Sequence, residues 1–353
     1  MEIGISTFVE TTPDAQTGKT ISHAQRIKEV IEEIRLADDV GLDVYGIGEH
    51  HRADFAASSP EMILAAAAPL TKKIRLSSAV TVLSSADPVR IFQNFATLDA
   101  ISNGRAEIMA GRGSFTESFP LFGFDLQHYD ELFEEHLALL MKIQKDNQAV
   151  HWQGGHRPAI NGLGVFPNPV QKKLPITVGT GGNPESSIRA AKLGLPIVYA
   201  IIGGQPASFA PLVELYKQTA ARSGHDVNQL QVASHSHGFV AKTTKEAIEK
   251  FFMPTQHVMN VIGKERGWPP YTRASYDAAR SFDGALYVGS PDTVAKKMIH
   301  LRKVVGITRF YLHLPLGTMP HEDVMGAIEL LGKEVAPMVR EEIKKWEHTG
   351  GRS

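Results

Sequence analysis

Val44-Tyr-Gly-Ile-Gly-Glu-His-His51 is a short apolar run that ends in a carboxylate and two histidines. Three later segments have the same form, with glycines and polar side chains where an apolar run ends: Arg75–Leu83, Ala106–Ser114 and Ile176–Asn183. A helical segment follows each of them. In a parallel α/β protein the loops at the carboxyl ends of the strands converge on one face, where ligands bind. The four segments therefore predict one site that combines histidines, an arginine and a glycine-rich turn.

Strands and helices alternate along the whole chain. Eight strands are predicted to begin near Ile3, Val44, Leu76, Ala106, Ile176, Ile197, Val232 and Phe310. A helix fits between each consecutive pair, and eight strand–helix pairs favour an α/β fold of the closed (β/α)8 TIM barrel type. The 353 residues could form two ordinary domains, but the unbroken alternation favours a single domain over residues 1–353.

Helix starts are marked by a capping side chain followed by proline, which is a strong start signal. The four such pairs are Ser59-Pro60, Asp87-Pro88, Asn183-Pro184 and Ser290-Pro291. The first helix is instead expected after Ser22, which is spaced with Gln25 as a capping box. Apolar residues then recur at helical spacing up to Gly41, which predicts a helix that packs on a sheet.

Two segments are too long for a minimal barrel. Residues 115–175 are expected to hold a helix from about Asp130 to Lys145 and then an irregular stretch rich in Trp, Gly and Pro. Residues 245–290 are expected to hold at least one helix and a second irregular stretch, Gly267–Tyr271. Long insertions on carboxyl-face loops usually act as lids or substrate walls, and surface decoration is the alternative.

Composition excludes several classes of protein. With 37 basic and 38 acidic side chains, the chain has no field that would attract nucleic acid or an anionic membrane. The amino terminus lacks the features of a signal peptide, and no segment has the roughly 20 apolar residues that span a bilayer, which favours a cytoplasmic protein. The absence of cysteine excludes disulfides, thiolate nucleophiles and thiolate metal ligands.

Histidines supply the candidates for acid–base chemistry or metal binding. Glu49, His50 and His51 follow the second strand, where a histidine can exchange protons near neutral pH or have a purely structural role. If the alternation of a strand persists, only one of the two histidines points over the barrel mouth, and the sequence leaves open which. His235 and His237 have the spacing of a metal-binding pair, but no third and fourth ligand is evident, so no metal site is expected.

An anion site is predicted from two neighbouring strands. Arg112 lies between Gly111 and Gly113, so its guanidinium could approach an anion closely and bind it in bidentate fashion. The turn Gly179–Asn183 leads directly into a helix, whose amino terminus favours a phosphate group. A surface arginine and an ordinary strand–helix turn are the alternatives. Ser77–Val82 ends the third strand with small residues, which leave room either for a flat ring or for layer packing inside the barrel.

A series of motifs resembles the bacterial luciferase-like, flavin-dependent monooxygenase family. The motifs are Gly48–His51, Ser78–Leu83, Asp87–Arg90, Leu98–Arg105, Gly111–Gly113 and Gly194–Pro196. The match runs from about residue 1 to 204 and resumes at Val288–Val294, and it is most similar to uncharacterised oxidoreductases of the family. The resemblance implies a (β/α)8 barrel that binds FMN at its carboxyl face.

The resemblance also implies roles for individual residues. The catalytic histidine of the family matches His50, and the bed of the flavin ring matches Ala79 and Val80, often joined by a cis peptide bond in the family. The phosphate site matches Arg112, Gly181, Gly182, Asn183 and Ser186. Light-emitting members have a cysteine where this chain has Gly111, which argues against luminescence but leaves flavin chemistry intact.

The resemblance favours an FMN-dependent oxidoreductase, and within that class a monooxygenase. Reduced FMN from a separate flavin reductase would act with O2 on a small organic substrate, while the protein would provide positioning, water exclusion and proton transfer. Relatives on the same barrel make a deazaflavin-dependent dehydrogenase the first alternative, and a non-catalytic flavin-binding protein is the second. The family also implies a homodimer.

Overall fold

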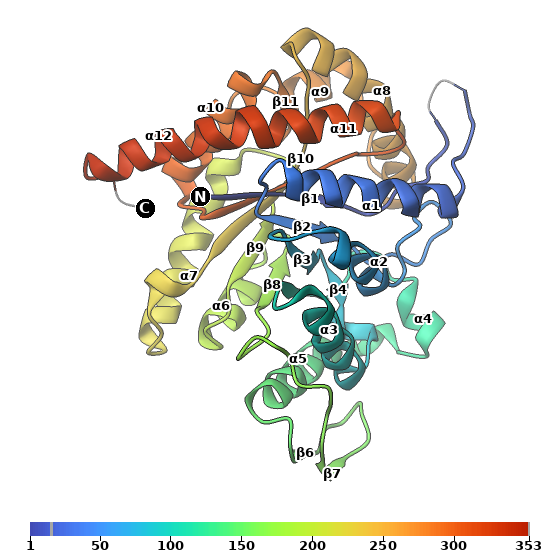
Figure 1. Ribbon diagram of the computed structural model, residues 1–353, viewed down its shortest axis with the longest axis vertical. Helices are drawn as coiled ribbons and strands as arrows, with labels where there is room; N and C mark the ends of the chain where they lie inside the picture. Colours follow the sequence, from blue (N-terminus) through green and yellow to red (C-terminus); the bar gives the residue numbers. More distant parts are fainter. Residues whose placement is uncertain (15–16, 352–353) are drawn as a thin grey trace.

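Eight parallel strands close into a barrel in the computed structural model, which describes residues 1–14 and 17–351 (Figure 1). The barrel strands are β1 (Glu2–Thr7), β2 (Val44–Ile47), β3 (Arg75–Ser78), β5 (Ala106–Gly111), β8 (Ile176–Thr180), β9 (Ile197–Ala200), β10 (Val232–Val240) and β12 (Arg309–His313). Neighbours pair in the order of the chain, and β10 pairs with both β9 and β12 around the closure. The predicted (β/α)8 barrel is confirmed, and each predicted strand start lies within one residue of the observed start.

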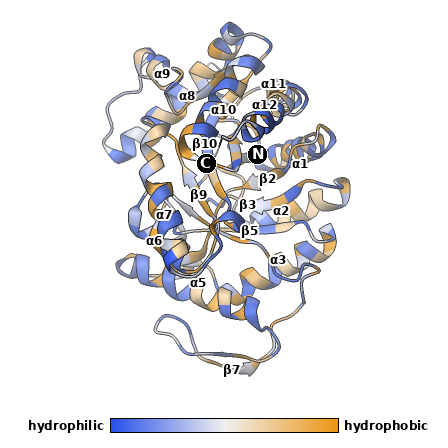
Figure 2. Cartoon of the chain, turned by 90° about the vertical axis from the view of Figure 1, so that its left-hand side faces the viewer, coloured by the Kyte–Doolittle hydropathy of each residue, from blue (hydrophilic) through white to orange (hydrophobic). Residues whose placement is uncertain are grey.

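Helices surround the barrel on its outside (Figure 1). They are α1 (His23–Asp39), α2 (Pro60–Ala67), α3 (Pro88–Ser102), α5 (Tyr129–Lys145), α6 (Pro184–Lys192), α7 (Ala210–Arg222), α10 (Pro291–Val305), α11 (His321–Leu330) and α12 (Ala336–His348). The hydropathy colouring of Figure 2 alternates between hydrophilic and hydrophobic along these helices, as expected for helices with one buried face. In the part of the chain that the structure describes, no helix is both long and apolar enough to cross a membrane.

The predicted helix starts are confirmed. Each of the four helices expected after a cap–proline pair begins at its proline, and Ser22 caps α1 by accepting a hydrogen bond from the Gln25 amide. The side chains of Asp87 and Asn183 also form capping hydrogen bonds, whereas Ser59 and Ser290 do not. Local capping signals therefore placed these helices correctly even where the capping bond itself is absent.

The two insertions contain more regular structure than the sequence indicated. Their elements are α4 (Ser118–Phe122), β6 (Val150–Trp152) and β7 (Ile160–Leu163) in the first, and α8 (Thr244–Arg266), α9 (Arg273–Ala279) and β11 (Tyr287–Gly289) in the second. The stretch expected to be irregular after α5 is an antiparallel hairpin, because Val150 and Ile160 are buried against the body of the protein. The third predicted strand is interrupted after Ser78, and its last residues form a separate two-residue strand, β4 (Thr81–Val82), that pairs with β5.

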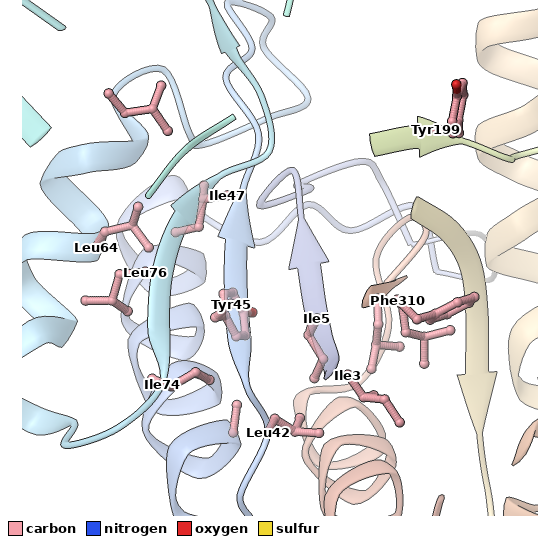
Figure 3. Close-up of a cluster of buried hydrophobic side chains, with 14 of the residues drawn as sticks. Ile3, Ile5, Leu42, Tyr45, Ile47, Leu64, Ile74, Leu76, Tyr199 and Phe310 are labelled. Carbon is pink, nitrogen blue, oxygen red and sulfur yellow. The ribbon is translucent and has the colours of Figure 1, made fainter. Parts of the chain in front are cut away.

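The strands separate two apolar layers. Side chains that point outward pack under the helices, and Figure 3 shows Ile5, Tyr45 and Leu76 of the strands in this layer, with Leu64 of α2 beside them. A smaller cluster fills the barrel itself; its members are Val44, Ala79, Met109, Val198, Ala233 and Tyr311. This division follows from the period of two along a strand, which sends alternate side chains to opposite faces.

Charged side chains close the barrel interior below this cluster. Glu107 of β5 accepts hydrogen bonds from Arg309 of β12, at 2.6 Å and 3.2 Å, and also pairs with Arg75 of β3. Arg309 in turn pairs with Glu2 at 2.5 Å. Burial by itself would raise the pKa of Glu107, but the charge and hydrogen bonds of Arg309 outweigh burial and lower the pKa. Glu107 is therefore a buried carboxylate whose charge depends on its two arginines.

We expect Arg309→Met to destabilise the protein by about 3 kcal/mol, because it leaves a buried carboxylate with only Arg75 as a partner. Urea denaturation followed by circular dichroism measures the change. Lys296→Met is the control, since it removes an exposed ion pair with Asp292 and should cost less than about 1 kcal/mol. Equal stability losses in the two variants would show that the Glu107 pairing does not hold the barrel interior.

Candidate active site

A cavity of about 280 Å³ opens at the carboxyl ends of the strands. Five of the eight residues to which the family resemblance gave a role line it, namely His50, Ala79, Val80, Arg112 and Gly181. Its other walls are mainly apolar and include Phe8, Met109, Phe115, Tyr129 and Val198, with His235 on the side of β10. An apolar cavity with a few polar groups at its edge is typical of a small-molecule site.

The floor of the cavity is the segment Ala79-Val80, which turns into the mouth of the barrel between β3 and β4. The peptide bond between these residues is cis, as the resemblance implied. Neighbouring strands approach this segment so closely that they carry glycine: a Cβ atom on Gly111 would lie 2.5 Å from Val80 Cγ2, and one on Gly179 would lie 2.8 Å from Val80 Cγ1. Glycine at positions 111 and 179 therefore leaves the space that the Val80 side chain occupies.

Glu49 holds the same segment in place. Its amide donates a hydrogen bond to the Val80 carbonyl at 3.0 Å, and its carboxylate accepts one from the Val82 amide at 2.8 Å. The second carboxylate oxygen lies 2.8 Å from Nε2 of His51. The sequence identified Glu49 only as a neighbour of the histidines, and the structure shows it as the residue that joins the β2 loop to the cavity floor.

His50 lies in an aromatic pocket beside the cavity. Its ring stacks on Phe55 with centroids 4.5 Å apart, and the edges of Phe8 and Phe115 approach it at 4.4 Å and 5.1 Å. Its Nδ1 atom is buried and has no hydrogen-bond partner among the described residues. Burial is the largest cause that lowers the pKa of His50, to about 3, and the nearby His313 adds to it. His50 is therefore neutral near pH 7.

Both histidines of the pair line the cavity. The strand β2 ends at Ile47, three residues before His50, so the alternation of a strand no longer applies to the pair. His50 is held by its amide, which donates to Ala57, whereas His51 is held by its ring through Glu49. The two residues therefore differ in the contacts that hold them, although both line the cavity.

The predicted anion site is divided between two places. Arg112 lies at the cavity, over the Tyr129 ring at 5.4 Å, and pairs with Asp130 at 2.5 Å. Gly181 also lines the cavity, and a Cβ atom there would meet nothing within 4 Å. Gly182 and the N-cap residue Asn183 precede α6, and Ser186 lies in its first turn; none of the three is among the lining residues.

The capping role of Asn183 restricts what this turn can offer a ligand. Asn183 Oδ1 accepts the Ser186 amide at 3.2 Å, and the Gly182 amide faces Thr180 Oγ1 at 3.3 Å. An anion at this turn could therefore contact the Gly181 backbone, which lines the cavity, and could be attracted by the positive end of α6. Phosphate binding at this turn stays a prediction.

The second insertion braces the cavity wall. Arg52, which follows the histidine pair, forms ion pairs with Glu117 at 2.8 Å and with Glu265 of α8 at 2.6 Å. The guanidinium of Arg266, also on α8, lies 5.1 Å from the Phe115 ring. The end of α8 therefore supports Phe115 from outside, which fits the expectation of a substrate wall better than that of surface decoration.

His235 and His237 do not form a metal site with a third ligand among the described residues. Within residues 1–14 and 17–351, the one group with three ligand-type side chains is His128, Glu131 and His156, whose ligand atoms lie within 4.8 Å of one another at the surface. Glu131 accepts from both rings there, at 2.9 Å and 3.1 Å, and these hydrogen bonds lower its pKa. The cluster joins the first turn of α5 to the tip of the β6–β7 hairpin.

Comparison with protein families gives a match over most of the chain. A family model described as luciferase-like monooxygenase matches residues 1–308. Among curated proteins, an uncharacterised protein of Sinorhizobium fredii is 24% identical over 348 residues, which are 94% of this chain and 97% of that protein. An N-acetyl-S-alkylcysteine monooxygenase of Bacillus subtilis is 25% identical over 319 residues, which are 85% of this chain and 90% of that protein.

Solved structures share the fold at low sequence identity. The monooxygenase RslO1 of Streptomyces bottropensis has a TM-score of 0.82 at 22% identity, covering 96% of this chain and 99% of its own. The oxygenating constituent of 3,6-diketocamphane monooxygenase of Pseudomonas putida, in complex with FMN, has a TM-score of 0.75 at 23% identity, covering 96% and 98%. The coenzyme F420 dependent tetrahydromethanopterin reductase of Methanopyrus kandleri has a TM-score of 0.71 at 22% identity, covering 95% and 98%.

The environment of His50 leads to a direct test of its protonation. Because burial lowers the pKa of His50 to about 3, its ring signal should not shift between about pH 8 and pH 5 in the folded protein. NMR of histidine-labelled protein measures this, and the spectrum of His50→Gln assigns the signal. The control is the same protein in urea, where the ring should titrate near about pH 6.5. A titration midpoint above about pH 5.5 in the folded state would contradict the buried, neutral His50.

Proposed function

The chain belongs to the luciferase-like monooxygenase family, and from that premise we propose that it is an FMN-dependent monooxygenase. In this proposal reduced FMN binds at the carboxyl face of the barrel and acts with O2 on a small organic substrate. A separate flavin reductase supplies the reduced cofactor, and no metal takes part. On the family resemblance we also propose a homodimer.

One observation carries the proposal: a mainly apolar cavity has the Ala79-Val80 segment and an arginine among its lining residues. Ala79 and Val80 form the floor, Arg112 lies at the rim, and the Gly181 backbone opens toward the amino end of α6. A tricyclic ring needs a flat apolar surface, and a phosphate needs a guanidinium or a helix amino terminus. The FMN complex of the Pseudomonas putida enzyme, which has the same fold, supports the choice of FMN.

Three features of the cavity fit a bound flavin. The buried Nδ1 of His50 has no partner among the described residues, so a polar edge of a ligand could satisfy it. Gly181 leaves open space where any other residue would place a Cβ atom, so the backbone there is accessible to a large ligand. Arg112 is held by Asp130, which is an exposed carboxylate and can be exchanged for a ligand anion.

The flavin, when bound in its reduced form, would supply the electrons that activate O2. The protein's part follows from its own residues. The floor at Ala79 and Val80 orients the ring, and Phe8 and Phe115 exclude water from the reacting edge. His50, neutral near pH 7, offers a hydrogen bond to a group in the cavity without adding charge.

The alternative is a dehydrogenase that uses a deazaflavin. It is favoured by the coenzyme F420 dependent reductase of Methanopyrus kandleri, which has the same fold over 95% of this chain. Absorbance and fluorescence titrations with FMN, riboflavin and F420 decide between the two. FMN binding stronger than F420 binding supports the monooxygenase, and the reverse order supports the dehydrogenase. Binding of FMN without any O2-dependent turnover would support a non-catalytic flavin-binding protein.

Arg112→Ala should raise the dissociation constant of FMN by roughly 10-fold to 150-fold, the equivalent of about 1.5 to 3 kcal/mol for a hydrogen bond to a charged group. Riboflavin, which lacks the phosphate, should bind both proteins equally. Fluorescence quenching measures both affinities. Arg157→Ala is the matched control, because Arg157 pairs with Asp87 outside the cavity lining and should leave FMN binding unchanged. An unchanged FMN affinity in Arg112→Ala would remove Arg112 from the phosphate site.

His50→Ala should lower O2-dependent turnover with reduced FMN by about 10²-fold to 10⁴-fold and should change FMN affinity far less. The reason is that His50 lies in an aromatic pocket beside the cavity, whereas binding is expected to depend on the floor and the rim. Oxygen consumption and FMN titration measure the two effects. His51→Ala is the comparison, since it disturbs Glu49 and the floor and should therefore weaken FMN binding. The opposite pattern would move the catalytic role to His51.

A further inference from the structure

A second polar layer lies inside the barrel mouth, on the side opposite the cavity floor. Ser6 of β1, His235 of β10 and His313 of β12 point inward from three adjacent strands, and Ser6 is the register partner of His313. Ser6 and His313 are fully buried. His235 lines the cavity, so the layer begins at the place where a ligand would lie.

These side chains form a continuous hydrogen-bonded chain that ends at a buried carboxylate. His235 Nε2 lies 2.5 Å from Ser6 Oγ and 3.3 Å from His313 Nδ1. The other ring nitrogen of His313 lies 2.9 Å from Oε1 of Glu10. Glu10 is only 2% exposed, and its second oxygen accepts a hydrogen bond from Thr7 Oγ1 at 3.0 Å.

The backbone is bent to bring Glu10 into this position. Val9, a buried β-branched residue, has a φ of 58°, a conformation that such residues rarely adopt. Its amide donates to Thr7 Oγ1 at 3.1 Å, which holds the bend. Burying a carboxylate is costly, and strain of this kind is concentrated at functional sites. An ordinary barrel core would place apolar side chains here, so the arrangement points to a chemical role.

The carboxylate determines the direction of the hydrogen bonds. An ionised Glu10 can only accept, so His313 Nε2–H donates to it, and Nδ1 of a neutral His313 must accept. His235 then carries its proton on Nε2 and donates it toward Ser6 Oγ and His313 Nδ1. Burial and the nearby His313 lower the pKa of His235 to about 3, which keeps the ring neutral. Its Nδ1, which no hydrogen bond among the described residues engages, is left as an acceptor.

We propose that His235, His313 and Glu10 form a proton relay that serves the cavity from the side of β10 and β12. A proton released by a group in the cavity forms an N–H bond at His235 Nδ1. The Nε2–H bond of His235 then breaks and its proton forms an N–H bond at His313 Nδ1. The positive charge comes to rest on His313 beside the Glu10 carboxylate, and the reverse sequence returns the proton. No electrons or further reactants are required.

The relay rests on the proposed function, because oxidation of a substrate in an apolar cavity requires protons to leave and enter that cavity. His235 would be the catalytic residue at the cavity, while His313 and Glu10 act through it as positioning residues. Pairing of a carboxylate with a histidine to define the tautomer of a reacting ring is a general device in enzymes and metal sites.

The test is Glu10→Gln, read by long-range ¹H–¹⁵N NMR of histidine-labelled protein with the His235 signal assigned by His235→Gln. Thr7 donates to one oxygen of Glu10, so in the variant the amide oxygen should face Thr7 and the amide nitrogen should face His313. His313 must then accept at Nε2 and carry its proton on Nδ1. We expect His235 to change from the Nε2–H tautomer in the natural protein to the Nδ1–H tautomer in the variant.

Turnover provides the second measurement. Glu10→Gln should lower turnover by about 10²-fold or more while FMN affinity changes less than about twofold, because the variant cannot hold a proton on His313. Glu61→Gln is the matched control: Glu61 accepts from Asn94 at 2.6 Å outside the cavity lining and should affect neither the tautomer nor turnover. His313→Gln interrupts the same path and should reproduce the loss of turnover if Glu10→Gln does not fold.

Two results would overturn the relay. One is a His235 ring that carries its proton on Nδ1 in the natural protein, and the other is full turnover in a folded Glu10→Gln or His313→Gln variant. The tautomer measurement requires no cofactor or substrate. Failure of the protein to bind any flavin would therefore count against the proposed function, while the NMR result would still decide whether the hydrogen bonds of the relay have the required direction.

Discussion

The close contact between Val80 and the backbone of two neighbouring strands is the constraint on which the candidate site depends. A single methyl group on Gly111 or Gly179 would overlap the Val80 side chain, so the floor exists only because β5 and β8 carry glycine at these levels. The atoms here are packed so closely that there is no space for an added atom. The orientation of the floor, the position of the rim arginine on β5 and the opening beside Gly181 all follow from that contact.

The barrel interior contains two buried charged layers with opposite designs. Below the apolar cluster, Glu107 is paired with two arginines, so both signs are present and hydrogen-bonded. At the mouth, the hydrogen-bond partners of Glu10 are Thr7 and the ring of His313, with no arginine or lysine among the described contacts. In the lower layer, arginines balance the carboxylate, and the layer closes the barrel. The upper layer has one carboxylate and no arginine, so a proton taken up by His313 adds a positive charge that Glu10 can balance.

Histidine chemistry in this site depends on burial more than on residue type. His50 and His235 have ordinary histidine rings, but their surroundings lower the pKa of each to about 3. Burial therefore keeps both rings neutral near pH 7 until another group supplies a proton. A neutral ring can still pass a proton when a second group accepts it, which is the difference between His50, whose Nδ1 has no partner among the described residues, and His235, which contacts His313.

The sequence by itself determined the eight barrel strands, the starts of five helices and the face on which the cavity opens, because these features depend on residues close together in the chain. Ser22 caps α1 through the amide of Gln25, and the glycines at the ends of β5 and β8 can be read directly beside the polar residues they accompany. The family resemblance added His50, Ala79 and Val80, although it said nothing of the role of Glu49. Only the tertiary structure brought Glu10 to His313, 303 positions away, and Ser6 to His235, 229 positions away. These contacts exist because β12 pairs with β1 on one side and with β10 on the other when the barrel closes. The local sequence of each strand shows which side chains point inward, but it does not show which of them meet across the barrel.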